Sequence, residues 1–206
     1  MASTASPYGL RAVNELGGLP YAGSTRTLLI DPAGYNTNIF NGSVVYVNSS
    51  GYINIVTGTG ADGTTNSFPG SGTLTGAVGV FVGCSYYNAQ GQLIFSQYYP
   101  ANTTGVVQAF VIDDDRTVFQ AQLDGTGAQT VLGTNTFFAA AQSTSTGSTT
   151  TGNSTSALDA TVVTTTAAFR IVGFVNSTTS QVGDAYTDVL VKFNPGYHSY
   201  SNAVGV

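Results

Sequence analysis

Residues 76–99, GAVGVFVGCSYYNAQGQLIFSQYY, contain two runs of apolar and aromatic residues separated by the short polar segment NAQG at 88–91. Valine, isoleucine, phenylalanine and tyrosine fit a pleated, half-buried sheet. The polar segment ends in a glycine, the residue that a tight turn needs where the backbone becomes left-handed. The stretch therefore predicts a β-hairpin, with one strand on each side of residues 88–91.

Similar short runs recur from residue 27 onward, separated by Asn-Gly, Asp-Gly and other glycine-containing turns. They lie at 27–30, 43–47, 52–56, 105–112, 117–122, 167–174 and 186–193. Short strands with regular turns between them are typical of a β-barrel or a β-sandwich. In the last run Val189, Val191 and Phe193 alternate with Asp188 and Lys192. This alternation predicts a strand with one buried and one solvated face.

The composition of the 206-residue chain also favours an all-β fold. Charged residues make up only 7% of the chain, against about 25% in typical domains. Glu15 is the single glutamate and Lys192 the single lysine, and both residue types favour solvent-facing helices. We therefore predict an all-β chain in which residues 27–206 form one β-barrel or sandwich domain of short antiparallel strands.

Two segments do not follow the strand pattern. Residues 1–26 are rich in glycine, proline and serine, and their apolar residues follow neither helical nor strand spacing, so we expect an extended N-terminal arm. Residues 139–157 carry no aromatic or branched aliphatic side chain, and burial therefore cannot offset the entropy lost on ordering them. They predict a long surface loop that is either a mobile tip or ordered by a neighbouring subunit.

No pattern in the sequence indicates catalysis or a cofactor. The only histidine, His198, lies near the C-terminus without a nucleophile motif nearby, and we expect it on the surface. One cysteine and one histidine cannot supply a usual zinc site, and Cys84 is expected to be a small buried apolar residue. The glycine-rich residues 57–66 lack the lysine and the helix of a phosphate-binding loop and predict a flexible turn. We expect no enzymatic activity, no cofactor and no metal.

Three adjacent carboxylates, Asp113, Asp114 and Asp115, separate two of the predicted strands. A calcium loop spaces its acidic residues at alternate positions and adds a glycine and a distal glutamate, whereas these three are contiguous and Arg116 follows them. Aspartate is favoured in turns because its side chain accepts hydrogen bonds from nearby backbone amides. The segment indicates a solvated turn in preference to a cation site.

The distribution of charge excludes some partners. The net charge is −5 and the five basic residues are dispersed, so no basic stripe is available to neutralise a phosphate backbone. The sequence has no apolar run of about 18 residues, and its N-terminus lacks the basic start and apolar core of a signal peptide. We expect neither nucleic acid nor a membrane as a partner.

Six segments spread over most of the chain resemble structural proteins of tailed bacteriophages, in particular capsid decoration (cement) proteins. They are YGLRAVNELGGLPYAGSTR (8–26), TNIFNGSVVYV (37–47), GVFVGCSYYNAQGQLIFSQYYPA (79–101), VIDDDRTVFQAQ (111–122), TAAFRIVGFVN (166–176) and GDAYTDVLVKFN (183–194). The resemblance implies a β-rich domain of the tulip-like or barrel kind. Such a protein is made in the host cytoplasm and binds the major capsid protein on the outer surface of the virion. It would trimerise at local three-fold positions and stabilise the expanded head. The chain departs from the small lambda type in being much longer.

We hypothesise that the N-terminal arm holds the protein to the capsid, with the alternative that the arm folds back on its own domain. The candidate capsid-binding residues are Tyr8, Leu10, Arg11, Val13, Leu16, Tyr21 and Arg26. Tyr98 and Tyr99 are adjacent at the end of a predicted strand, so strand alternation allows only one of them to face the core of the domain. They are candidates for the subunit interface of a homotrimer, where tyrosine is enriched, unless the outer one merely covers a sheet face.

A carbohydrate-binding or adhesin-like β module is the main alternative. Twelve tyrosines and many asparagines and glutamines are able to build stacking and hydrogen-bonding pockets for sugars. The absence of tryptophan and of a tandem repeat weakens this reading. A hydrolase that acts through the acidic cluster is the third possibility.

Overall fold

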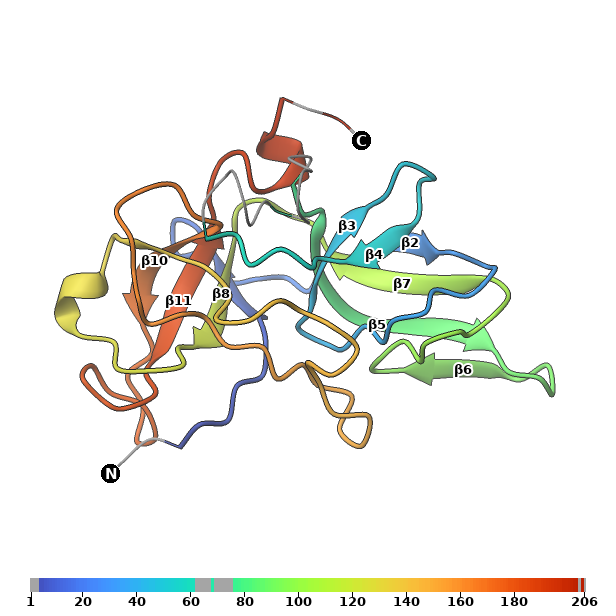
Figure 1. Ribbon diagram of the computed structural model, residues 1–206, viewed down its shortest axis with the longest axis horizontal. Coiled ribbons are helices and arrows are strands. Elements are labelled where there is room, and N and C mark those ends of the chain that lie inside the picture. The colour runs from blue at the N-terminus through green and yellow to red at the C-terminus, as the bar shows by residue number, and fades with distance from the viewer. Residues whose placement is uncertain (1–3, 62–67, 69–75, 204, 206) are drawn as a thin grey trace.

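The computed structural model describes residues 4–61, 68, 76–203 and 205 (Figure 1). Within these residues the chain forms eleven strands, two short 3₁₀ helices, η1 (Gln129–Val131) and η2 (Ser199–Ser201), and no α-helix. The all-β prediction is therefore confirmed. Residues 62–66 of the predicted glycine-rich turn lie outside the described part of the chain.

The strands form two antiparallel sheets that do not close into a barrel, so the arrangement is sandwich-like. Sheet A has the strand order β1 (Arg11–Glu15), β8 (Thr117–Gln122), β11 (Asp188–Phe193), β10 (Phe169–Phe174) and β9 (Asn135–Thr136). Sheet B has the order β2 (Arg26–Ile30), β7 (Val107–Ile112), β5 (Gly79–Tyr87), β3 (Val44–Val47) and β4 (Ile53–Ile55), and β6 (Leu93–Ser96) pairs with β5. Of the expected architectures, the sandwich is the one observed.

The predicted hairpin at residues 88–91 is confirmed, because it joins β5 to β6. The Asn88 N–H donates to the Gln92 carbonyl (3.0 Å), and the Gly91 N–H donates to the Asn88 carbonyl (2.9 Å). Gly91 is left-handed, with φ of +77°, as this turn requires. Every run predicted as a strand contains one, and the predicted alternation of β11 is observed. Only β1 and β9 were not predicted.

Among the described strands, the chain crosses between the two sheets twice, at residues 16–25 and at residues 113–116. The N-terminal segment supplies β1 to sheet A and then β2 to sheet B, and both lie at the edge of their sheet. Later, β7 of sheet B continues through the acidic turn into β8 of sheet A (Figure 1). Two separate pieces of backbone therefore join the sheets.

Two hydrophobic clusters form the interior. The first core lies between the sheets and includes Val44, Val80 and Ile112 from sheet B and Phe119, Phe169, Ile171, Val191 and Phe193 from sheet A. The second core lies on the opposite face of sheet B and includes Ile30, Val45, Phe81, Cys84, Tyr99, Val107 and Val111. Cys84 is buried in this second core, which confirms the prediction that it is a small buried apolar residue, and burial raises the pKa of its thiol to about 12.

Sheet A covers only part of the face of sheet B that it packs against. Along β7, Gln108 is exposed, Phe110 is half-buried and Ile112 is buried, although alternation puts all three on this face. The exposed ends of β5, β6 and β7 extend away from sheet A, to the right in Figure 1. Part of this face is therefore left without a covering layer among the described residues.

Residues 139–157 pack against their own domain, an arrangement that neither of the two expected alternatives included. The buried Gln142 side chain accepts from the Val44 N–H (3.0 Å) and donates to the Val56 carbonyl (3.2 Å). The backbone at Gly152 and Ser154 bonds the backbone of Asn41 (3.0 and 2.8 Å). This segment is held by polar contacts rather than by apolar burial, which is why its composition concealed its order.

Candidate functional site

The N-terminal segment folds back on its own domain, so the expected extended arm is wrong for much of residues 1–26. β1 pairs with β8, and β2 pairs with β7. Leu10 is buried in the first core, and its N–H donates to the Gly42 carbonyl (2.9 Å). Burial of Leu10 and the strand hydrogen bonds stabilise this arrangement. Residues 4–26, the described part of the segment, therefore do not form an extended arm that lies free of the domain.

The candidate capsid-binding residues consequently do not form one surface. Leu10 is inside the core, and Tyr21 is half-buried against it. Arg26 forms an ion pair with Asp113 (2.7 Å). Only Val13 and Leu16 present exposed apolar side chains. The two remaining residues, Tyr8 and Arg11, line a polar groove that is described below.

Tyr98 and Tyr99 follow the end of β6 and differ in burial. Tyr99 is fully buried in the second core, and its hydroxyl accepts from the Tyr35 N–H (3.0 Å). Because no part of Tyr99 is exposed, it offers no surface to a second copy of the chain. Tyr98 is half-buried and stacks on Phe40, with ring centres 5.7 Å apart.

The acidic segment forms the predicted turn. The Asp114 carboxylate accepts from the Arg116 N–H (2.8 Å), and its carbonyl accepts from the Thr117 N–H (3.2 Å). Asp113 is held by Arg26 (2.7 Å) and by the Tyr200 hydroxyl, which donates to it (3.0 Å). Among the described residues no three histidine, cysteine, aspartate or glutamate side chains come together in a group able to hold a metal ion.

His198 is buried, with 1% of its surface exposed, so its predicted surface position is wrong. Its ring contacts those of Phe193 and Tyr200, at centre distances of 5.4 and 5.3 Å. Its Nδ1 accepts from the Tyr200 N–H (3.3 Å). Burial lowers the pKa of His198, and the nearby acidic turn opposes this effect. The C-terminal segment covers the histidine in a way that its position in the sequence did not indicate.

On the face of sheet B that packs against sheet A, the part that sheet A leaves uncovered forms an apolar surface, which we name the distal face. It consists of Tyr87, Leu93, Phe95, Val106 and Phe110, together with the polar Ser85 and Gln108. In the sheet register Ser85 lies opposite both Phe95 and Gln108, and Tyr87 lies opposite Leu93, so these side chains share one face. Phe95, Tyr87, Val106 and Leu93 are 73%, 63%, 62% and 49% exposed. Large exposed apolar residues gathered on one sheet face mark a contact surface.

The distal face is shallow and carries no charge. A hollow of about 210 Å³ lies on it between Tyr87, Phe95 and Phe110. At its border β6 pairs only with β5 among the described strands. An unpaired strand edge offers backbone hydrogen-bonding groups to another chain. The distal face thus combines apolar side chains with an open edge.

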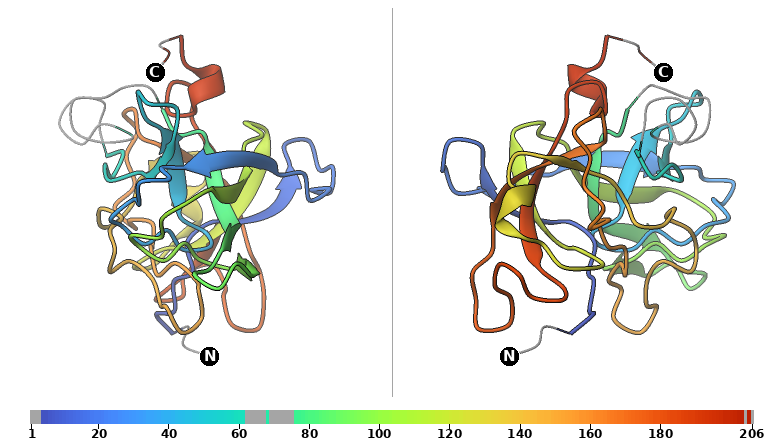
Figure 2. Two further views of the ribbon diagram at one scale, coloured as in Figure 1. Left: turned by 90° about the vertical axis from the view of Figure 1, so that its right-hand side faces the viewer. Right: turned by 60° about the vertical axis from the view of Figure 1, so that its left-hand side comes forward.

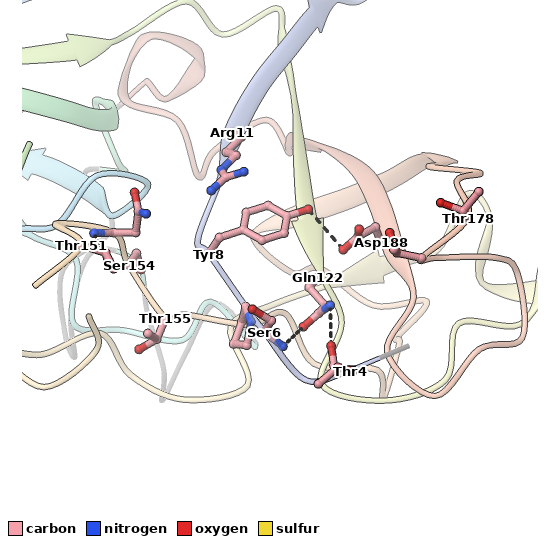
Figure 3. Close-up of a pocket in the computed structure, with 13 residues that line it drawn as sticks. Thr4, Ser6, Tyr8, Arg11, Gln122, Thr151, Ser154, Thr155, Thr178 and Asp188 are labelled. Atoms are coloured by element: carbon pink, nitrogen blue, oxygen red, sulfur yellow. Dashed lines mark hydrogen bonds between the residues drawn. The ribbon is translucent and has the colours of Figure 1, made fainter. Parts of the chain in front are cut away.

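A polar groove of about 640 Å³ lies where the N-terminal residues, the 151–155 segment and the 178–179 segment meet (Figure 3). At its centre the Tyr8 hydroxyl donates to Asp188 Oδ1 (3.2 Å), and Gln120 donates to Asp188 Oδ2 (3.4 Å). The Arg11 guanidinium lies over the Tyr8 ring, 4.4 Å from its centre. The groove therefore places an acid, a phenol and a guanidinium side by side.

A second polar contact fixes the floor of the groove. The Gln122 side chain accepts from the Ser6 N–H (2.7 Å) and donates to the Thr4 carbonyl (3.3 Å). Burial raises the pKa of the Tyr8 hydroxyl and of the Asp188 carboxyl, and Tyr8 and Arg11 oppose the shift at Asp188. At neutral pH Tyr8 is consequently a hydrogen-bond donor and not a phenolate.

Comparison of the chain with protein-family models, with curated proteins and with solved structures found no match. Among the described residues no helix has the length and apolar character needed to cross a membrane.

Sequence reasoning missed both the distal face and the groove. Tyr8 and Asp188 are 180 positions apart in the chain, so no local pattern indicates that they meet. The sequence predicted that Tyr87 and Phe95 lie on strands. It did not show that they are exposed, because this depends on how much of the sheet B face is covered by sheet A. The only available signal was the concentration of aromatic residues on both sides of the hairpin.

Proposed function

We propose that the chain is a structural virion protein that binds the outer surface of a tailed-phage capsid and stabilises the expanded head. In this proposal it docks on the major capsid protein through the distal face of sheet B. The observation that carries the proposal is the exposure of Tyr87, Leu93, Phe95 and Val106 on one uncovered sheet face. Full burial of such a side chain contributes about 1.5–3 kcal/mol, so a partner that covers the face gains substantial stabilisation.

The chemistry of the distal face defines the partner surface. No charged side chain belongs to it, so the matching surface of the capsid protein is also apolar and uncharged. The open edge of β6 is able to pair with an extended segment of that protein, an arrangement that adds main-chain hydrogen bonds to the apolar contact. Sheet pairing and apolar burial together suit a permanent structural contact.

The proposal retains a homotrimer on the virion surface, with a changed choice of contact residues. Tyr99 is excluded because it is buried. Val13 and Leu16, both exposed on and beside the edge strand β1, replace it as the apolar candidates, with the half-buried Tyr98 as a third. Light scattering of the free protein and a reconstruction of decorated heads measure the number of copies at each position.

Docking is tested by sedimenting the purified protein with expanded heads of the phage that encodes it. Wild-type protein should pellet with the heads, and Phe95→Ser and Leu93→Ser should each weaken the association by at least about tenfold, as expected for central apolar contacts. Both side chains are exposed, so the fold tolerates these changes. Leu132→Ser, which changes an exposed apolar residue outside both the distal face and the proposed trimer contact, is the matched control.

Three results would count against docking through the distal face. The wild-type protein would fail to pellet with expanded heads, both sheet B variants would bind like wild type, or Leu132→Ser would weaken binding as much as Phe95→Ser does. In the last case the contact surface lies outside the distal face.

A further inference from the structure

We propose that the polar groove beside Tyr8 binds a neutral oligosaccharide. This inference goes beyond capsid docking and does not depend on it, because the groove is built by sheet A and by loops, while the distal face belongs to sheet B. It starts from the chemistry of the groove walls.

Uncharged hydroxyl and amide side chains supply most of these walls. Thr151, Ser154 and Thr155 lie on one side and Thr178 on the other (Figure 3), and Asn153 and Thr179 also line the groove. Hydroxyl groups both donate and accept hydrogen bonds, and amides offer separate donors and acceptors. A ligand that forms hydrogen bonds with these side chains therefore carries many groups, along its length, that also both donate and accept hydrogen bonds. Sugar hydroxyls have this character, whereas an apolar ligand would leave the wall groups without hydrogen bonds.

The charges in the groove indicate a neutral ligand. Arg11 and Asp188 are the charged residues among those that line it, so the positive and negative charges balance. An anion would meet the Asp188 carboxylate, and a cation would meet the Arg11 guanidinium. A neutral polyol avoids both repulsions and is able to use both groups, since charged hydrogen bonds are stronger than neutral ones.

Both charged groups keep hydrogen-bonding capacity for a ligand. Each carboxylate oxygen of Asp188 accepts one hydrogen bond from the chain, from Tyr8 or from Gln120, and a carboxylate oxygen has room for a second. Arg11 forms no ion pair with the described residues and carries five N–H donors. Two adjacent sugar hydroxyls fit between such an acceptor and such a donor.

Several side chains that line the groove are already held in place before a ligand binds. Tyr8 is fixed from both sides, by its bond to Asp188 and by the guanidinium over its ring (Figure 3). The nearly buried Gln122 ties Ser6 and Thr4 to sheet A. A binding site whose side chains are already ordered loses less entropy when it binds. The volume of about 640 Å³ lies within the usual range for ligand sites, about 300–1,000 Å³.

The test is a screen of the purified protein against immobilised neutral oligosaccharides built from glucose, galactose, mannose and N-acetylhexosamines, with sialylated and sulfated glycans in the same panel. The strongest neutral member is then titrated by calorimetry. Arg11→Ala and Asp188→Asn should each weaken its binding by about tenfold or more, the effect of losing a hydrogen bond to a charged group. Arg116→Ala and Asp115→Asn change exposed residues of the same types outside the groove and should leave binding unchanged.

Circular dichroism of every variant checks that the fold is retained. If Asp188→Asn proves unstable, the exposed Arg11→Ala decides the result by itself. The inference is overturned if no neutral oligosaccharide binds, if only sialylated or sulfated glycans bind, or if both groove variants bind like the wild type. A loss of binding in both pairs of variants would also overturn it, because the site would then lie outside the groove.

Discussion

His198 shows how strongly the position of one residue depends on the rest of the molecule. It is the N-cap of η2, and the backbone on either side of it is tied to Ala77, because the Ser199 N–H donates to the Ala77 carbonyl (2.7 Å). The C-terminal segment thereby presses the imidazole against Phe193. A neutral ring is favoured in this position because burial lowers its pKa.

The buried histidine makes stability depend on pH. In the unfolded chain the pKa of histidine is about 6.5, and in the folded protein it is lower. The unfolded state therefore binds the proton first, so the stabilisation is fully present above pH of about 6.5 and is lost as the pH falls through the folded-state pKa. Denaturant unfolding between neutral and mildly acidic pH should show a decline for wild type and a smaller one for His198→Asn.

Asparagine is a suitable replacement because its side-chain oxygen is able to accept the Tyr200 N–H and because it is a favoured N-cap residue. If wild type and His198→Asn lose stability in parallel as the pH falls, another group causes the decline. Asp113, Asp114 and Asp115 lie close enough to raise the histidine pKa, so the same measurement in Asp115→Asn should show a steeper decline.

At the scale of single elements, the docking of the N-terminal segment depends on a close approach of two backbones. Gly9 has φ of +73°, and a Cβ atom at this position would lie 2.5 Å from the Gly42 carbonyl oxygen. The neighbouring Leu10 N–H bonds that same oxygen (2.9 Å). A side chain at position 9 therefore disturbs both the backbone conformation and the hydrogen bond that precedes β1.

Gly9→Ala should lower the free energy of unfolding by about 2–4 kcal/mol, the sum of left-handed strain and a steric clash. Gly23→Ala is the matched control, because Gly23 has φ of +79° but nothing within 4 Å of a Cβ atom. Gly23→Ala therefore introduces the strain of a left-handed backbone without the steric clash that Gly9→Ala adds. Equal losses in the two variants, measured by chemical denaturation, would mean that contact with Gly42 contributes nothing.

The buried Gln142 side chain is one of the contacts that hold the 139–157 segment on its domain. This side chain bonds the backbone of Val44 and Val56 inside the protein, and these groups have no access to water when the side chain is removed. Gln142→Ala should reduce stability by about 1–3 kcal/mol for each buried group left without a partner. Gln90→Ala, in the exposed hairpin turn, should change it by less than about 0.5 kcal/mol.

Thermal unfolding of both glutamine variants measures this difference directly. Proteolysis adds a local readout, since residues 139–157 should be cleaved faster in Gln142→Ala than in wild type if this side chain holds the segment. Unchanged cleavage with unchanged stability would show that the segment is held by other contacts, such as those between Gly152, Ser154 and Asn41.

These elements also show what the sequence was able to predict. The β5–β6 hairpin was predictable because its turn residues and both strands are adjacent in the chain. β1 was not, because its partner β8 is about a hundred residues away and because a bulge between Ala12 and Asn14 breaks the alternation. β9 has only two residues, too few for any periodic pattern. The all-β class followed from composition, whereas the exposed surfaces depended on tertiary packing.

At the scale of the whole molecule, the sparse charge of the chain governs how it associates. Only 7% of residues are charged, and none of these belongs to the distal face. Sedimentation with expanded heads should therefore vary by less than about threefold between low and moderate salt, because screening acts only on charges. Sedimentation across a salt series measures this directly. A decline of tenfold or more over the series would contradict an apolar contact and would favour ion pairs made by Arg11 or Arg116.

The two crossings of the backbone between the sheets have a mechanical consequence. Suppose that sheet B is fixed to a capsid lattice and that a force acts on sheet A. The force is then transmitted through the 16–25 segment and the acidic turn, because both segments connect sheet A to sheet B. The Arg26–Asp113 ion pair fastens one crossing to the other near their ends. Because two connections carry the force, sheet A is less free to rotate relative to sheet B about either connection alone. In a force-spectroscopy experiment the sheets should yield together as one unit, with no early step in which sheet A peels away from sheet B.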